Sequence, residues 1–346
     1  MKVGFCTYPM LWQRTGGLQV QMKETISALR SLGCDAELFD TNRQRLGDFQ
    51  LIHIFGAING NEKIAEAARS ARIPLVISSV LHPPFTRFDA LRARLATMVT
   101  RRLTGWQFTT SYDLTRRAVN AADAVVALGE EEQTLLRTGY DVSPERISVV
   151  PNGISSRFQE AEGALFREHI DINGPFLLQV SSITPYKNPL ASARAAAALD
   201  LPLVLIGQTP GDGEPYLEQC RDAAGGRLHY VGALPADSPL LPSAYAAAQV
   251  LLLPSKSEVM PLVTLEALAA GTPVVMTSHS SLELDNAGKR LQTFDPTDQA
   301  GFEKTIRGVV NAPPSTEECR DLVKHMTWKA VAEQLEQIYR RILASR

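Results

Sequence analysis

Residues 249–276 read QVLLLPSKSEVMPLVTLEALAAGTPVVM, and this stretch decides the fold. Residues 250–253 and 273–276 are apolar runs of strand length, and the ten residues 261–270 between them predict a crossover helix. A proline suits the first turn of such a helix, and Gly271 suits the left-handed position that follows its end. The pattern therefore predicts a βαβ unit within a parallel sheet.

Two glutamates distinguish this unit. The predicted helix is apolar almost all round except at Glu266, and a desolvated carboxylate without a partner costs several kcal/mol or more. Glu258 lies eight residues earlier, in the loop before the helix start, where free amide groups favour anions. The spacing leaves two interpretations open. The two acids either have structural roles or bind a ligand that carries both hydroxyls and phosphates.

Size and composition limit the class of protein. A chain of 346 residues is long enough for two α/β domains of about 150 residues each. The formal net charge of −2 gives no reason to expect a nucleic-acid partner. The cysteines form no C-x-x-C pair, so we expect reduced, buried thiols and no metal site at Cys6, Cys34, Cys220 and Cys319. The sequence has neither an apolar run of 18 residues nor a signal-peptide pattern, so we expect a cytoplasmic protein.

The N-terminal half alternates strand-like and helix-like segments. A first strand at residues 3–7 leads through Gly16 and Gly17 to a helix that Gly33 closes. The diglycine predicts either a plain loop or a place where a phosphate meets a free helix N-terminus. Apolar strands follow at residues 51–55, 74–80, 124–128 and 147–150. The alternation predicts a doubly wound parallel sheet, which binds its ligands beyond the carboxyl ends of the strands.

Histidines occur in or after two of these strands. For His53, inside a strand, we favour a hydrogen-bonded core residue. His82 follows a strand end, and both a structural and a functional role stay open for it.

An arginine-rich segment, Arg87 to Arg117, carries a local charge of +5, counted from seven arginines and two aspartates. One interpretation is a solvated helical face. The other is contact with an anionic membrane surface or with a pyrophosphate-bearing acceptor.

The C-terminal half begins after Asn152 and Gly153, which favour a turn and a domain boundary. A strand at residues 176–180 precedes the loop 181–188, and further strands are predicted at 203–206 and 228–232. Sheets of this kind can bind a nucleotide base at the carboxyl ends of their strands, but the residues at these strand ends do not identify which base.

The segment around Glu258 and Glu266 closely resembles the E-x7-E signature of the family 4, or group 1, retaining glycosyltransferases of GT-B fold. Residues 123–154 and the final helix after Thr327 resemble the same family, so the resemblance runs from residue 1 to about residue 345. It implies an α/β fold with two Rossmann-like doubly wound domains facing across a cleft, and a C-terminal helix crossing back to the first domain. The implied N-terminal acceptor domain spans 1–152 plus 327–346, and the implied nucleotide-sugar donor domain spans 153–326.

The resemblance also implies roles for individual residues. Glu258 would bind the hydroxyls of the transferred sugar, and Glu266 would bind the ribose. Lys187 would bind the diphosphate, and His82 would line the reaction centre. The remaining donor-binding positions implied are Gly16, Gly17, Ser182, Met260, Pro261 and Leu262.

One departure from the family pattern concerns charge. Where the family has Gly-Arg, this chain has Ser181 and Ser182, and one cation facing the diphosphate is missing. Such a donor is worth roughly 3 kcal/mol in the transition state. Lys256 and Arg14 are the candidates to replace it.

By resemblance, the protein is a retaining glycosyltransferase that needs neither metal nor cofactor. It would move a sugar from a nucleoside-diphosphate sugar to a saccharide, lipid-linked or small-molecule acceptor. Two alternatives stay open: an epimerase or phosphorylase on the same fold, and a non-catalytic nucleotide-sugar-binding subunit of an active transferase. For the glycosyltransferase, we also expect that peripheral contact with the inner face of the membrane is possible through the segment 87–117.

Overall fold

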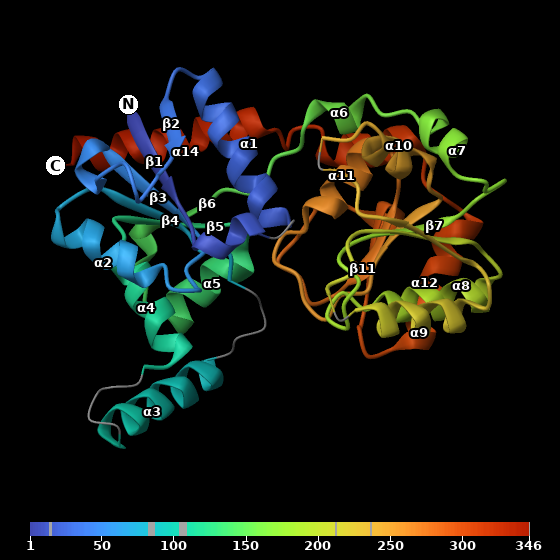
Figure 1. Cartoon of the computed structure of the whole chain (residues 1–346), viewed down its shortest axis with the longest axis horizontal. Coiled ribbons are helices and arrows are strands. Elements are labelled where there is room, and N and C mark those ends of the chain that lie inside the picture. Colours follow the sequence, from blue (N-terminus) through green and yellow to red (C-terminus); the bar gives the residue numbers. More distant parts are fainter. Residues whose placement is uncertain (14–15, 82–86, 104–108, 212, 236, 346) are drawn as a thin grey trace. The chain divides into compact units, whose positions relative to one another are not determined.

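The computed structural model describes residues 1–13, 16–81, 87–103, 109–211, 213–235 and 237–345. The chain divides into two compact units, which are Met1–Gly153 with Met326–Arg346 (unit 1) and Ile154–His325 (unit 2). Each unit is built on a six-stranded sheet whose neighbouring strands all run parallel (Figure 1). The predicted two-domain α/β fold of Rossmann-like units is confirmed.

The sheet of unit 1 has the strand order β2-β1-β3-β4-β5-β6. Its strands are β1 (Lys2–Cys6), β2 (Asp35–Leu38), β3 (Leu51–Phe55), β4 (Leu75–Ser78), β5 (Ala124–Ala127) and β6 (Ile147–Val149). Its helices are α1 (Gly17–Ser31), α2 (Glu62–Ser70), α3 (Arg87–Leu103), α4 (Ser111–Ala121), α5 (Glu130–Gly139) and α14 (Trp328–Ala344).

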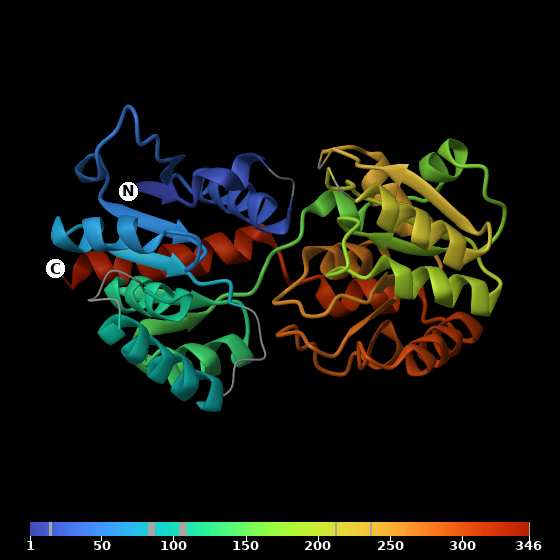
Figure 2. The ribbon, with the colours of Figure 1, turned by 60° about the horizontal axis from the view of Figure 1, so that its bottom comes forward.

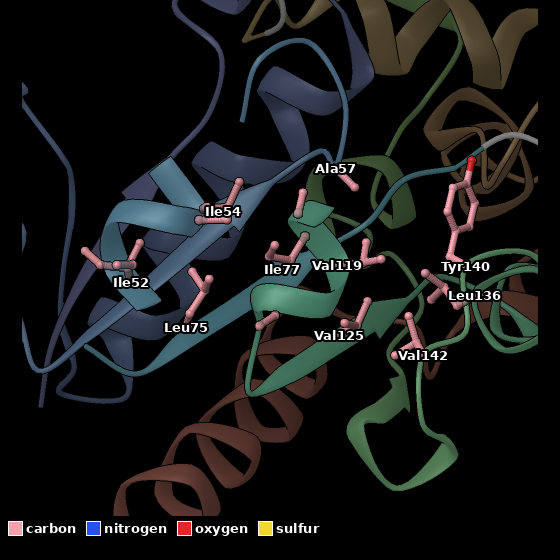
Figure 3. Packing of buried hydrophobic residues seen from close by; sticks show 14 of the residues in the cluster. Ile52, Ile54, Ala57, Leu75, Ile77, Val119, Val125, Leu136, Tyr140 and Val142 are labelled. Carbon is pink, nitrogen blue, oxygen red and sulfur yellow. The ribbon is translucent and has the colours of Figure 1, made fainter. Parts of the chain in front are cut away.

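The core of unit 1 lies between its sheet and the helices that cover it (Figure 3). Alternate strand residues such as Ile52 and Ile54 point to the same face, where Val119 of α4 packs. Each of these three side chains is fully buried. Burial of one such side chain stabilises the fold by roughly 1.5–3 kcal/mol, so the sheet is a firm support for the loops at its edge.

The C-terminal helix belongs to unit 1. Its N-cap Thr327 accepts a hydrogen bond from the backbone of Ala330 at 3.1 Å, and α14 packs against α1. Tyr339 of this helix hydrogen-bonds Nδ1 of His53 at 2.6 Å, while Nε2 of His53 lies 2.9 Å from the Ser78 hydroxyl. The return of the last helix to the first domain is therefore confirmed, and so is the assignment of His53 as a satisfied core residue.

The sheet of unit 2 has the strand order β12-β11-β10-β7-β8-β9. Its strands are β7 (Leu177–Val180), β8 (Leu203–Ile206), β9 (Leu228–Gly232), β10 (Val250–Leu253), β11 (Val274–Thr277) and β12 (Leu291–Phe294). Its helices are α6 (Ser156–Gln159), α7 (Ala164–His169), α8 (Pro189–Leu199), α9 (Glu214–Ala224), α10 (Leu240–Ala247), α11 (Leu262–Ala270), α12 (Gln299–Asn311) and α13 (Thr316–Val323).

The predicted βαβ unit is present as β10, α11 and β11. The two strands pair in parallel, with Leu251 opposite Val274. Helix α11 begins one residue later than predicted, because Pro261 has extended backbone angles and occupies the N-cap. Gly271 adopts the predicted left-handed conformation with φ 97°, and a Cβ there would lie 2.2 Å from Thr316 of α13. Only glycine satisfies both constraints at this position.

The predicted burial of the cysteines is confirmed, since Cys6, Cys34, Cys220 and Cys319 are all buried. Within the described ranges, no helix combines the length and the apolar character that a membrane span requires.

Candidate functional site

The topology of unit 2 creates a switch point between β7 and β10. These neighbouring strands lead the chain in opposite directions, since β8 and β9 follow on one side and β11 and β12 on the other. Open α/β sheets bind ligands in the crevice beyond the carboxyl ends of two such strands. The loops that leave β7 and β10, residues 181–188 and 254–261, therefore border the expected binding position.

The two loops meet in an ion pair. Nζ of Lys187 donates to Oε1 of Glu258 at 2.6 Å, although the two residues are 71 positions apart in sequence. The Glu258 side chain is 7% exposed and that of Lys187 is 28% exposed. The backbone N–H of Glu258 also donates to the carbonyl of His279 at 2.8 Å. The carboxylate is thus buried beside one cation that solvent or a ligand can reach.

Gln179 at the end of β7 positions the loop that carries Lys187. Its Nε2 donates to the Lys187 carbonyl at 3.0 Å and to the Ser181 hydroxyl at 3.0 Å. Its Oε1 accepts from Ser192 of α8 at 2.7 Å. The role of Gln179 was not predicted, although a buried amide in an otherwise apolar strand is a signal that it needs partners.

Backbone contacts also join the two loops. The N–H of Lys256 donates to the carbonyl of Tyr186 at 2.9 Å, and the Tyr186 hydroxyl donates to the carbonyl of Ser257 at 2.9 Å. The Lys256 side chain is exposed, and its ammonium has no hydrogen bond or ion pair to any residue in the described ranges. Ser182, where the family has arginine, is half-buried. Lys256 is therefore a cation in the same loop pair as Ser182.

Helix α11 starts beside this loop pair. Met260, Pro261 and Leu262 at its start are buried, and the helix is buried on nearly all sides. Glu266, half-buried, accepts a hydrogen bond from the Tyr245 hydroxyl of α10 at 2.9 Å. Burial, reinforced by the Glu266 carboxylate, raises the pKa of Tyr245 well above its ordinary value. Tyr245 therefore stays protonated and orients one oxygen of Glu266, a partner that the sequence did not reveal.

Two buried hydroxyls near these loops have no hydrogen-bond partner among the residues that the structure describes. They belong to Ser255, which follows β10, and to Ser281, whose backbone N–H donates to the carbonyl of Val259 at 2.9 Å. Unpaired buried polar atoms are uncommon in folded proteins, and each calls for an explanation, of which a ligand or a water molecule is one.

The predicted residues of unit 1 form a separate group. Helix α1 begins at Gly17 with Gly16 as its N-cap, and no side chain caps its first amides. A Cβ at Gly16 would meet no atom within 4 Å among the described residues of unit 1 beyond its chain neighbours. His82 and Arg14 lie outside the described residues, and their roles stay predictions.

The end of β4, just before His82, holds a feature that the sequence did not predict. Glu132 of α5 is fully buried, and its carboxylate accepts hydrogen bonds from Ser79 at 2.6 Å, Leu81 at 2.7 Å and Leu128 at 2.7 Å. Between Ser79 and Leu81, Val80 has φ 49°, a strained value for a β-branched residue. Strain of this kind persists only where surrounding contacts enforce it. Here the Glu132 carboxylate holds the chain on both sides of Val80, at Ser79 and at Leu81.

Burial raises the pKa of Glu132, while hydrogen bonds from the surrounding chain, including Val80, act in the opposite direction. No cation pairs with it in the hydrogen bonds that the structure describes. Glu132 is thus a positioning residue for the loop that leads to His82.

Within the described ranges, no cluster of three or more histidine, cysteine, aspartate or glutamate side chains could hold a metal ion. The polar groups on the two loops at the switch point of unit 2 and on helix α11 are two ammonium groups, two carboxylates, hydroxyls and helix amides. Such a set suits a ligand with negatively charged phosphates and sugar hydroxyls.

Comparison with known families supports this reading. Residues 175–312 match the family described as "Glycosyl transferases group 1", and residues 38–153 match the "Glycosyl transferase 4-like domain". The first match contains Lys187, Glu258 and Glu266.

Two curated relatives illustrate the similarity. D-inositol 3-phosphate glycosyltransferase 2 of Catenulispora acidiphila is 30% identical over 248 residues, which cover 65% of this chain and 57% of the relative. Alpha-maltose-1-phosphate synthase of Mycolicibacterium smegmatis is 26% identical over an alignment that covers 99% of this chain and 100% of the relative. The chain thus spans little more than half the length of the first of these relatives.

Solved structures share the fold. Sucrose-phosphate synthase of Thermosynechococcus elongatus superposes with a TM-score of 0.79 at 18% identity and covers 100% of both chains. Anabaena Alr3699/HepE in complex with UDP has a TM-score of 0.70 at 19% identity and covers 98% of this chain and 99% of its own.

Proposed function

Since the chain belongs to the group 1 glycosyl transferases of GT-B fold, we propose that it is a retaining, metal-independent glycosyltransferase. It moves a sugar from a nucleoside-diphosphate sugar to a saccharide, lipid-linked or small-molecule acceptor. Unit 2 binds the donor, and unit 1 binds the acceptor.

The observation that carries this proposal is the ion pair between Lys187 and Glu258 at the switch point of unit 2. When a donor binds, its diphosphate competes with Glu258 for the Lys187 ammonium. Glu258, released from its cation, then accepts hydrogen bonds from the hydroxyls of the transferred sugar. The exchange leaves neither the Lys187 ammonium nor the buried Glu258 carboxylate without a partner, which avoids the cost of an unpaired buried carboxylate.

Charge stabilisation in this site comes from the protein's own groups. As the bond between sugar and diphosphate breaks, negative charge grows on the leaving diphosphate, and preorganised donors lower the barrier. Lys187 and the amides at the start of α11 are those donors. Glu266, oriented by Tyr245, accepts from the ribose hydroxyls. The acceptor attacks from the face that the diphosphate leaves, which retains the configuration of the anomeric carbon.

Two findings on other proteins support the donor class. The solved structure of Anabaena Alr3699/HepE holds UDP, and a second structure of it holds UDP and glucose. The curated relatives carry the names of a glycosyltransferase and of a synthase of a sugar phosphate. A nucleoside diphosphate bound by unit 2 and an acceptor with hydroxyl groups agree with these bound ligands and with the names of these relatives.

The replacement of arginine by Ser182 favours a second candidate, a subunit that binds nucleotide sugar without turnover. Under the main proposal, Lys256 supplies the missing cation. Lys256→Ala then weakens donor affinity and turnover, whereas Lys304→Ala, an exposed lysine of α12, leaves both unchanged. Equal kinetics for the two variants would remove Lys256 from the site.

The experiment that tests the function is a panel of nucleoside-diphosphate sugars, with diphosphate release followed in the presence and absence of acceptors. Transfer that yields a product with the anomeric configuration of the donor, read by NMR, supports the proposal. Isomerisation of the donor would indicate an epimerase, and release that depends on inorganic phosphate would indicate a phosphorylase.

Binding is read in the same panel as a shift of thermal stability. A ligand at about a hundred times its dissociation constant stabilises the fold by roughly 2.7 kcal/mol. Clear stabilisation without turnover under any condition would favour the non-catalytic subunit.

A further inference from the structure

Helix α3 of unit 1 presents a row of large apolar side chains to solvent. Their exposed fractions run from 51% to 80%. We call this row the outer stripe, and its members are Phe88, Leu91, Leu95, Met98, Val99 and Leu103. Among described residues, eleven large hydrophobic side chains are exposed, and six of them lie in this one helix. Single apolar residues scattered over a surface are ordinary, whereas a contiguous exposed apolar patch marks an interaction surface.

The outer stripe is the exposed face of α3. Each of its members lies three or four residues from another member, so they share one side of the helix. The opposite side holds the buried Ala90 and Thr97, and the Thr97 hydroxyl lies 2.6 Å from that of Thr110 before α4. Contacts with α4 and α5 attach α3 to its unit, and Figures 1 and 2 show α3 at the border of unit 1. One side of the helix is thus anchored while the other stays uncovered.

The charge of α3 is strongly positive. Its 17 residues include five arginines and one aspartate, a net charge of +4 in a chain whose formal net charge is −2. Arg92 and Arg102 are exposed on the same side as the outer stripe, and neither has an ion pair to a residue that the structure describes. Arg94 differs, because it pairs with Asp141 at 2.6 Å. The outward arginines are therefore available to an external anion.

A hollow of about 540 Å³ lies against the same helix. It is lined by Arg94, Thr97, Met98, Arg102, Tyr112, Asp113 and Arg116. Arg94 and Arg116 in this lining are ion-paired with Asp141, so Arg102, beside Met98 of the outer stripe, is the guanidinium group of the hollow that an external anion can reach. Guanidinium groups bind phosphate oxygens in a planar, two-pronged geometry.

From these features, we propose that α3 is an interfacial helix that docks the protein on an anionic lipid bilayer. The outer stripe enters the boundary between headgroups and acyl chains, and Arg92 and Arg102 meet lipid phosphates. An apolar face interspersed with two arginines, whose long side chains can reach the headgroups while the apolar residues lie deeper, on a helix too charged to span a bilayer, fits a helix that lies in the membrane surface. A docked helix of this length covers about 25 Å of membrane surface.

The charge pattern favours a membrane over a second copy of the chain. Two copies that paired through their outer stripes would bring two helices of +4 together, and like charges in contact disfavour association. An anionic bilayer supplies the opposite charge and a fluid apolar layer at once. The inference goes beyond the proposed function and does not depend on it, because lipid binding requires neither donor nor acceptor.

The test is co-sedimentation of the full chain with vesicles of phosphatidylcholine alone or mixed with phosphatidylglycerol. The unchanged protein is expected to bind the mixed vesicles and to lose binding as salt rises. Leu91→Glu combined with Leu95→Glu is expected to weaken binding by at least about tenfold, because it places charge where apolar contact is needed. Arg92→Glu combined with Arg102→Glu is expected to weaken it by about as much, through the loss of attraction to lipid phosphates.

The matched control is Leu165→Glu, an exposed leucine of α7 in unit 2, which is expected to leave vesicle binding unchanged. Circular dichroism checks that each variant is folded. Failure of the unchanged protein to bind mixed vesicles would overturn the proposal, and so would full binding by the double leucine variant. Analytical ultracentrifugation supplies a further check: a dimer that the leucine changes dissociate, without vesicle binding, would show that a second copy covers the outer stripe instead.

Discussion

Each unit of the molecule buries a glutamate near the carboxyl ends of its strands, and the two carboxylates are compensated in different ways. Glu132 of unit 1 is surrounded by fixed backbone and hydroxyl donors. Glu258 of unit 2 is paired with the ammonium of Lys187, whose side chain is 28% exposed.

The difference teaches what each glutamate can do. Donors in the main chain cannot leave without local unfolding, so Glu132 can only hold the chain in place, including the strained Val80. A lysine side chain can turn to another anion at little cost, so Glu258 can exchange its partner for a ligand. A buried carboxylate therefore indicates a binding site only when its compensating charge is able to move.

The largest effect is expected at the exchangeable pair. Lys187→Met removes the cation that faces the diphosphate, and we expect donor turnover to fall by about 10²–10³-fold, or about 3–4 kcal/mol. It also leaves Glu258 buried and unpaired, so unit 2 should lose about 3 kcal/mol of stability. Turnover is measured by diphosphate release, and stability is measured by urea denaturation.

The double variant Lys187→Met with Glu258→Gln separates the two effects. Removing both charges should return most of the stability, while turnover stays low. Turnover equal to that of the unchanged protein in either variant would show that this pair is structural, like Glu132.

The second effect concerns the fixed carboxylate. Glu132→Gln turns an amide group toward N–H donors that need an acceptor, and we expect unit 1 to lose about 3 kcal/mol of stability. Hydrogen exchange read by mass spectrometry should show faster exchange in β4 and β5. Glu130→Gln, an exposed residue at the start of the same helix, should cost no more than about 1 kcal/mol. Comparable losses in the two variants would mean that Glu132 is not a clamp.

A third effect is a dependence of the stability of unit 1 on pH, which originates at His53. Burial lowers the pKa of His53 to about 3 from an ordinary value of 6.5. Between these values the unfolded chain binds a proton that the folded chain excludes, so stability is complete above pH 6.5 and is lost as pH falls toward 3. At pH 5 we expect unit 1 to be less stable by about 2 kcal/mol than at pH 7.

The comparison variant is His53→Gln, which has no titrating ring. Its unfolding free energy, measured by urea denaturation between pH 7 and pH 5, should fall less steeply than that of the unchanged protein. Parallel pH profiles for the two proteins would contradict the assignment of this dependence to His53.

The smallest effect is expected at the second glutamate of unit 2. Tyr245→Phe removes only the hydroxyl that donates to Glu266, which is worth about 1 kcal/mol. We expect the KM for the donor to rise about fivefold with little change in kcat, because Glu266 binds substrate and transition state alike under the proposal. A fall in kcat with KM unchanged would instead place Glu266 near the reacting bond.

Much of the architecture could be predicted because strands, helices and turns depend on short sequence patterns. Apolar runs gave β3, β8, β9 and β10 with the bounds that the structure has, and the left-handed Gly271 was predicted from its place after a helix. The edge strands β2 and β12 were missed, since each is only partly buried and carries polar residues between its apolar ones. The same local reading placed Pro261 inside the first turn of α11, whereas its extended ψ keeps it at the N-cap.

The sequence by itself determined the alternation of strands and helices, the βαβ unit around α11 and the family resemblance that points to Lys187, Glu258 and Glu266. These features depend on periodicity, turn residues and motif spacing, which act over a few residues. Only the tertiary structure decided which polar groups meet. Parallel pairing of β7 with β10 brings Lys187 within 2.6 Å of Glu258, and packing of α10 on α11 gives Glu266 its tyrosine. A partner that lies tens of residues away leaves no local pattern, so the choice between a fixed and an exchangeable carboxylate belongs to the fold.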